Sequence, residues 1–541
     1  DKHIDTRRVL EKIRKHVAVS DTQDVRLKEE LYHGRVAKRV DDFLSQELKP
    51  LVMEMAGRQV TMPELEKYLH ARHAEERNIQ IAKINQKLPD GGSGMDTKDA
   101  RIYLSGLAPD KKRAYEALAK RVDAINEKTR QAVVSYTLES QKTVDAWEAV
   151  YKHYVPLHRE DMDGSPGTGQ GFSIRGPATK RAMGSKRAVV DILANIAAQR
   201  EKTIVRGEKN RFDTALVGLV GASPNTDFWE VDTPPKIKYV DERTGLVTER
   251  VDPLYKSREN VVMARIPDAS GEIVEHAVVF NEFDDRAMRM AASLKNLDMD
   301  DLGHVLGLSA KITRYFASVN TQYNPVFGVV NITRDVQGAM LNLSSTELAG
   351  EQVAVLKNTL SALRGIYIDT RDVRQGKAAT SKWARLWEEF QGVGGKTGYR
   401  DMFRTGKDRG EAIEREFKRA SEGKAMGAGR AVFDWLSDYN TAMENAVRLS
   451  AYKVGIDNGM TKERAASLAK NLTVNFNRKG QIATQAGALY AFFNASVQGT
   501  ARLAETLAGP AGRKIITGGL ALGVGQAIAL AAAGCDDDEP P

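Results

Sequence analysis

An asparagine–proline pair inside a strongly helical stretch restricts the fold of this chain more than any other sequence feature. On both sides of Asn324 and Pro325, between residues 310 and 345, apolar residues recur at spacings of three and four, which predicts two amphipathic helices. Proline fixes its own φ and disfavours helical geometry in the residue before it. We therefore expect the first helix to end near Gln322 and the second to begin at about Pro325.

Polar side chains interrupt the apolar face of the second predicted helix at Asn331, Arg334 and Asp335. A buried polar group costs roughly a few kcal/mol unless it is hydrogen-bonded, so these three residues need partners. Residues 471–502 contain the same mixture, and we expect the two stretches to pack together. The residues of this second stretch that we single out are Asn475, Asn477, Arg478, Phe493, Asn494 and Gln498.

Four motifs in these stretches resemble a domain of the large polyvalent proteins of phages and phage-like elements. They are Tyr323–Gly328, Asn331–Asp335, Asn475–Gly480 and Phe493–Gly499. Similar segments occur in the internal virion proteins of short-tailed phages, which are ejected into the host ahead of the DNA. The resemblance extends from about Tyr154 to Ala533. It names a family without naming a reaction, because none of the motifs has the mechanism of a catalytic motif.

The charge composition indicates which kinds of partner the chain could bind. Its 541 residues include 80 Lys and Arg and 72 Asp and Glu, which gives a net charge of +8 with both signs interspersed. A mild excess of this kind is compatible with contact to DNA or to anionic lipid, and more simply with a solvated mixed surface. The single cysteine, Cys535, means that no disulfide forms within the chain.

Hydrophobic periodicity predicts a mainly α protein, an elongated multi-helix body with a small antiparallel β insertion. Ala114, Leu118, Val122 and Ile125 form an apolar stripe that is typical of a helical bundle. Further helices are expected at 187–206 and at 211–220. Within residues 228–283 the period changes, and turns near 243–245 and 268–271 predict two successive β-hairpins in one small sheet.

Composition shifts and breaks along the chain divide it into six predicted segments. They are an N-terminal helical bundle at 1–153, a glycine-rich loop with helices at 154–227, the β insertion at 228–283, a helical core with the Asn-Pro corner at 284–391, a C-terminal helical core at 392–510, and an apolar helix with an acidic tail at 511–541.

Two glycine-rich segments, 164–177 and 392–398, look at first like phosphate-binding loops. The first has no hydrophobic strand before it, which a dinucleotide fingerprint needs. The second contains Gly395, Lys396 and Thr397, but Phe390 stands where a Walker loop needs its first glycine. We therefore predict a flexible crossing loop and a glycine-rich hinge, and no nucleotide site.

An uncharged segment of 20 residues, from Ile515 to Gly534, is about long enough to cross ~30 Å of hydrocarbon as a helix. Its alanines and glycines make it only modestly hydrophobic, so a buried helix in an oligomeric core fits as well as a membrane or channel helix. The residues of interest are Ile515, Gly519, Gly523, Gln526 and Ala533.

The search for catalytic and metal-binding groups yields no site, and we predict no catalytic residue, metal or cofactor. His70 and His73 have near-ligand spacing but lack the zincin pattern, so a solvated helix face is the better interpretation. Glu139 and Ser140 match only the start of a lytic transglycosylase motif. A hydrolase would need a pocket with clustered carboxylates, which spacing alone does not reveal.

The resemblance therefore implies a phage internal virion or ejection protein with a structural role. Such a protein would be synthesised in the host cytoplasm and would form a homo-oligomer in the virion interior. There it would also contact other virion proteins, namely portal or core proteins. It would then be delivered into the host envelope to help the genome pass. Two alternatives remain: a non-catalytic linker domain of a larger polyvalent protein, and a DNA-binding virion protein.

Overall fold

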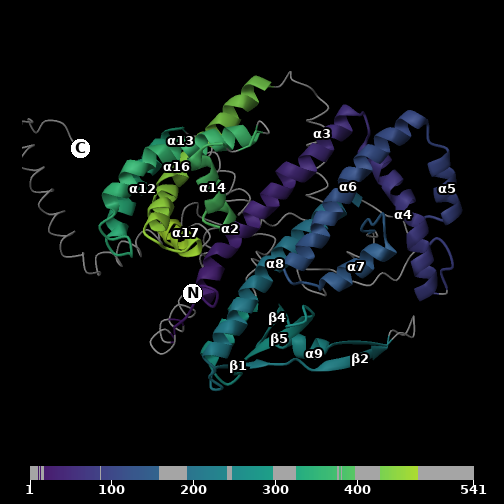
Figure 1. Ribbon diagram of the computed structural model, residues 1–541, viewed down its shortest axis with the longest axis horizontal. Coiled ribbons are helices and arrows are strands. Elements are labelled where there is room, and N and C mark those ends of the chain that lie inside the picture. Colours follow the sequence, from purple (N-terminus) through teal and green to yellow (C-terminus); the bar gives the residue numbers. More distant parts are fainter. Residues whose placement is uncertain are drawn as a thin grey trace, which may run out of the picture. The chain divides into compact units, whose positions relative to one another are not determined.

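Figure 1 shows the computed structural model of the protein, which describes residues 10, 13, 18–85, 87–157, 192–240, 247–295, 325–374, 377–378, 380–396 and 427–472. The chain divides into two compact units. The first unit comprises residues 1–304 with 400–427, and the second comprises residues 305–399 with 428–541. Every strand that the structure describes belongs to the first unit.

Helices make up most of the described residues in both units, so the predicted mainly α class with a small β insertion is confirmed. In the first unit they are α2 (Val25–Phe43), the π-helix η1 (Leu44–Leu48), α3 (Lys49–Gly57), α4 (Met62–Ile84), α5 (Thr97–Ser105), α6 (Pro109–Ser135), α7 (Gln141–Val150), α8 (Ile192–Ala222), α9 (Pro253–Ser257) and α10 (Asp285–Lys295). In the second unit they are α12 (Pro325–Leu343), α13 (Gln352–Arg374), α14 (Lys382–Gly392), α16 (Gly427–Asp457) and α17 (Lys462–Asn471).

Short polar side chains start several of these helices by binding the free N–H groups of the first turn. The Asp24 carboxylate accepts from the Leu27 N–H at 3.1 Å at the start of α2. At the start of α4 the Thr61 N–H donates to the Glu64 carboxylate at 2.9 Å, which is half of a capping box. At the start of α17 the hydroxyl of Thr461 accepts from the Arg464 N–H at 3.3 Å.

Helix α8 connects two hydrophobic cores of the first unit. Its N-terminal residues Ile192 and Ile196 are buried in a core with side chains of α3, α4 and α6. Its C-terminal residues Phe212 and Leu216 are buried in a second core with the sheet and α10. Figure 1 shows α8 running from the helices toward the strands. With 31 residues at 1.5 Å per residue, α8 is about 46 Å long.

The prediction of two separate helices in this region is wrong, because α8 continues through residues 207–210 without a break. From the sequence, Gly207 suggests that the helix ends here, because glycine weakens a helix. In the structure it makes room for a neighbour: a Cβ at this position would lie 2.0 Å from the ring of Tyr136. The close approach of the Tyr136 ring explains a glycine in the middle of a long helix.

The strands form two antiparallel sheets. A three-stranded sheet has the order β1 (Trp229–Asp232), β5 (Ile273–Phe280), β4 (Val261–Pro267), and β2 (Lys236–Val240) pairs only with β3 (Val247–Val251). Both predicted hairpins are confirmed, but the expectation that they share one sheet is wrong. Strand β1, which was not expected from the sequence, pairs with the edge of β5 that β4 leaves open, with Trp229 opposite Phe280.

The second unit packs around the aromatic face of α14. Trp387 and Phe390 are buried with their ring centroids 5.8 Å apart, and Phe390 also contacts Tyr452 of α16 at 5.1 Å. The hydroxyl of Tyr452 donates to Glu389 at 2.7 Å. Helix α12 is described from Pro325 onward, and residues 310–324 lie outside the described residues, so the Asn-Pro corner stays a prediction.

A tight turn ends α14 within the segment that the sequence predicts as a hinge. The Gly395 N–H donates to the Phe390 carbonyl at 2.9 Å, and Gly394 has φ 94°, which only glycine adopts without strain. The buried amine of Lys470 on α17 donates to the Gly394 carbonyl at 3.2 Å. Residues 392–396 therefore anchor α17 to the end of α14, while hinge motion stays a prediction.

None of the helices within the described part of the chain is long and apolar enough to cross a membrane. The candidate membrane or channel helix at 515–534 lies outside the described residues.

A test of the α8 contact compares two glycines of the same helix. Replacing Gly207 with alanine places a methyl group against the Tyr136 ring, and overpacking of this kind costs about 1–3 kcal/mol. Urea denaturation followed by circular dichroism should show a corresponding loss of stability. Gly221→Ala is the matched control, because a Cβ there meets nothing within 4 Å. Equal stability of the two variants would contradict the close contact.

Candidate functional site

The middle of α8 is polar although it is buried. Residues 203–213, which we call the α8 polar segment, contain four polar residues in the interior, where a helix joining two cores would ordinarily carry apolar side chains. They are Thr203, Glu208, Asn210 and Asp213. Buried polar groups persist where they are bonded, so the partners of this segment identify the most specific region of the first unit.

Asn210 joins α8 to the backbone of β4 and of the turn after α6. Its amide donates to the carbonyl of Arg265 at 2.8 Å and to the hydroxyl of Thr137 at 2.9 Å, and its side-chain oxygen accepts from the Arg265 N–H at 2.8 Å. A fourth contact, also donated by the amide, runs to the carbonyl of Tyr136 at 3.2 Å. Asn210 thus satisfies both backbone groups of one strand residue and holds that strand on the helix.

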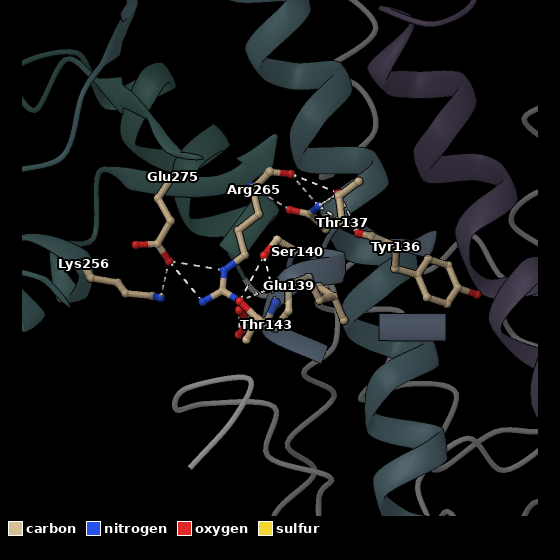
Figure 2. A network of polar contacts seen from close by, with 10 residues as sticks. Tyr136, Thr137, Glu139, Ser140, Thr143, Lys256, Arg265 and Glu275 are labelled. Carbon is tan, nitrogen blue, oxygen red and sulfur yellow. Dashed lines mark hydrogen bonds and ion pairs between the residues drawn. The ribbon is translucent and has the colours of Figure 1, made fainter. Parts of the chain in front are cut away.

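The guanidinium of Arg265 extends the same network in the opposite direction. Figure 2 shows it between two carboxylates, Glu275 on the neighbouring strand and Glu139 at the start of α7, at 3.2 and 3.3 Å. It also donates to the carbonyl of Leu138. Lys256 of α9 lies 3.9 Å from Glu275. A planar guanidinium with several donors suits such a junction of helix, turn and sheet.

The positive φ of Thr137 shows how closely the turn is fitted to this junction. Its φ is 55°, a left-handed conformation that residues other than glycine adopt rarely. The hydroxyl of Thr137 donates to the carbonyl of Arg265 at 3.2 Å. The bonds from Asn210 and to Arg265 offset the cost of the unusual backbone conformation.

Glu208 is the centre of a second cluster on the α8 polar segment. Its carboxylate is fully buried and lies 3.1 Å from Arg35 and 2.9 Å from Arg39, both on α2. Arg211 lies 3.4 Å away, and the hydroxyl of Tyr136 donates to Glu208 at 3.2 Å. Breaking such a buried pair costs far more than its net contribution, because one charge is left unpaired. Glu208 therefore fixes the position of α2 on α8.

Tyr136 takes part in both clusters. The guanidinium carbons of Arg39 and Arg211 lie 5.7 and 5.8 Å from the centre of its ring, which is within the range of cation–π attraction. Burial, helped by the charge of Glu208, raises the pKa of Tyr136 far above its usual range. The phenol therefore stays protonated and acts as a hydrogen-bond donor.

His73 on α4 occupies a separate buried position. Its ring packs edge-on against Tyr151 at 5.5 Å and Tyr154 at 5.8 Å, and its Nδ1 lies 3.8 Å from Glu76, beyond hydrogen-bond distance. Among the described residues neither ring nitrogen has a hydrogen-bond partner. Burial lowers the pKa of His73, and Glu76 only partly opposes this shift.

The interpretation of His70 and His73 as a solvated pair is therefore wrong. Both side chains are buried, because the loop before α5 and the segment after α7 cover this side of α4. The Nε2 atom of His70 lies 3.0 Å from the carbonyl of Ser93 in that loop. The residues directly after α7 donate two backbone N–H groups to Glu76, at 2.7 and 2.9 Å.

These groups bind one another and the backbone. Glu139, which the sequence analysis considered beside Ser140 as a partial transglycosylase motif, is paired with Arg265, and Ser140 accepts from the N–H of Thr143 to start α7. In the ranges that the structure describes, no three His, Cys, Asp or Glu side chains are placed to hold a metal ion. The network is arranged to position secondary structure.

The predicted signature residues lie in the second unit, and the structure describes few of them. Pro325 is the first described residue of α12, and Asp335 is buried in that helix. Asn342 of α12 donates to the carbonyl of Leu472 at 2.8 Å, a bond that joins α12 to the residue after α17. Outside the described residues, or with side chains outside them, lie Asn324, Asn331, Arg334, Asn475, Asn477, Arg478, Phe493, Asn494, Gln498, Ile515, Gly519, Gly523, Gln526 and Ala533. The packing of the two stretches stays a prediction.

Comparison of the chain with protein-family models, with curated proteins and with solved structures finds no match.

The roles of Asn210, Glu208 and Arg265 were not expected from the sequence. One signal was present for the first two: between Ala197 and Phe212 the apolar rhythm of α8 weakens while its helical composition continues. Arg265 gives no such signal, since an arginine in a short strand is ordinarily exposed.

Removing the side chain of Asn210 should destabilise the first unit. Asn210→Ala leaves the N–H and the carbonyl of Arg265 without their bonds, and an unsatisfied buried group costs about 1–3 kcal/mol. Urea denaturation measures the change. Gln131→Ala removes one exposed side-chain bond on α6 and should change stability by less than about 0.5 kcal/mol. A neutral Asn210→Ala variant would contradict the role assigned to this residue.

Stability should depend on pH through His73. The unfolded chain binds a proton at this residue near pH 6.5, whereas the folded chain does so only at lower pH. The unfolded state therefore gains protons first, and stability falls as the pH decreases from about 6.5 through the lowered folded pKa. Urea midpoints between pH 8 and pH 5 should show this decrease. It should become smaller in His73→Phe, and an identical pH profile would contradict the assignment.

Proposed function

We propose that the chain is an internal virion protein of a phage, a structural protein that assembles inside the particle and is then delivered into the host envelope to help the genome pass. Four motifs that resemble segments of ejected virion proteins support this class, namely Tyr323–Gly328, Asn331–Asp335, Asn475–Gly480 and Phe493–Gly499. A homo-oligomeric state and contact with portal or core proteins belong to the same proposal.

The observation that carries the structural role is how the buried and half-buried charges of the first unit are used. Glu208 joins α8 to α2 through Arg35 and Arg39, and Arg265 joins β4 to β5 and to the start of α7. A catalytic acid or base must instead be able to exchange its proton with a substrate. Carboxylates held by guanidinium groups are suited to fixing elements, which favours an assembly role.

Delivery into the envelope depends on the segment from Ile515 to Gly534. It is uncharged, and it contains Gly519 and Gly523 at the spacing that lets helices approach closely. In the proposal this segment inserts into or lines a passage through the membrane, while the charge-paired first unit keeps its fold.

Flotation with lipid vesicles tests this function. The purified chain should sediment as an oligomer and should float with vesicles that contain anionic phospholipid, because the apolar segment partitions into hydrocarbon. Deletion of residues 515–534 should leave the chain at the bottom of the gradient. Circular dichroism of the deletion variant serves as the control for folding. A monomeric chain that stays with the bottom fraction would contradict the proposal.

A further inference from the structure

Helix α13 in the second unit has two apolar faces, and in the part of the unit that the structure describes one of them is buried and the other is exposed. The buried face consists of Val355, Ala362 and Ile366. A second row on the same helix is exposed to solvent, at spacings of three and four residues that align it along the helix. It consists of Val353, Leu356 and Leu360, which are 62%, 49% and 76% exposed.

The exposed row stands on a helix that is firmly held from the other side. The hydroxyl of Ser450 on α16 donates to the carbonyl of Val355 in a buried bond of 2.5 Å. Gly365 lies so close to Trp383 of α14 that a Cβ would come within 2.3 Å of its side chain. The exposed face is therefore preformed, and a partner would not have to order it.

Cationic side chains run beside this row. Lys357 follows Leu356 directly, and Arg364 lies seven residues further along the same side of the helix. Both are exposed, and among the described residues neither forms an ion pair. Arg371, one heptad further, binds Asp372 at 3.1 Å. The apolar row is thus flanked by two positive charges that have no carboxylate in the described part of the chain.

We propose that the row of Val353, Leu356 and Leu360 is a docking surface for an amphipathic helix of another protein, whose apolar seam is flanked by carboxylates. Three apolar residues in heptad positions fit the seam of a facing helix. Lys357 and Arg364 supply the charge complement to its acidic flank. The proposal concerns α13 alone and does not depend on the phage setting.

The charges also argue against a second copy of α13 as the occupant. In an antiparallel pair the flanking positions of one helix face the same positions of the other, which brings Lys357 of one copy close to Arg364 of its partner. Like charges in this arrangement destabilise the pair. An acidic helix removes the repulsion and replaces it with attraction.

The test uses two synthetic helical peptides, each about 21 residues or three heptads long. Both carry leucine at the seam positions. One carries glutamate at the flanking positions and the other carries lysine. Fluorescence anisotropy with the full chain should show binding of the glutamate peptide and at least about tenfold weaker binding of the lysine peptide. Equal affinity for both peptides, or no binding of either, would overturn the proposal.

Variants locate the binding to α13. Leu360→Glu should weaken the binding of the glutamate peptide by at least about tenfold. The double variant Lys357→Glu with Arg364→Glu should weaken it to the same extent. The matched control is Leu254→Glu on α9, where an equally exposed leucine, 79% against 76%, is changed in the same way. It should leave binding unchanged. Circular dichroism and gel filtration confirm that each variant is folded.

Two further outcomes would assign the surface to another occupant and overturn the proposal. Light scattering could show a self-associated chain that Leu360→Glu dissociates, which would identify a second copy. Vesicles of anionic phospholipid could bind the chain through the same residue while the peptides do not, which would identify a membrane surface.

Discussion

The bonds between Asn210 and the backbone of Arg265 are the interaction on which the first unit depends. Helix α8 enters one core with Ile192 and another with Phe212. The apolar contact between them, Ile204 on Tyr32 and Val36 of α2, leaves a gap where α8 meets β4. The amide of Asn210 fills this gap by satisfying the N–H and the carbonyl of one residue of β4. Without that match, burying the strand against the helix would leave two backbone groups unpaired.

The charged residues around this point extend the same principle to other elements. Glu208 would be costly to bury alone, but Arg35 and Arg39 of α2 and the hydroxyl of Tyr136 surround it. Tyr136 in turn requires Gly207, because any side chain there would occupy the position of the ring. A glycine, a buried acid and a phenol on separate segments therefore depend on one another.

The two units use their side chains differently. In the first unit the charged groups at the centre bind one another across helices and sheet. In the second unit α13 is held by Ser450 and by the close approach of Trp383, yet presents Val353 and Leu360 to solvent. A rigid helix that exposes apolar side chains beside Lys357 is suited to binding, since exposed apolar rows of this kind ordinarily mark interaction sites. This arrangement agrees with a protein that functions in an assembly.

The sequence by itself determined the helical class, both hairpins and the buried stripe of α6, because each follows from local rules of periodicity and turn formation. Only the tertiary structure decided that β1 pairs with β5, that His73 is buried and that Asn210 meets Arg265. Those partners are far apart in the chain, 55 residues in the last case, and local patterns contain no information about distant contacts.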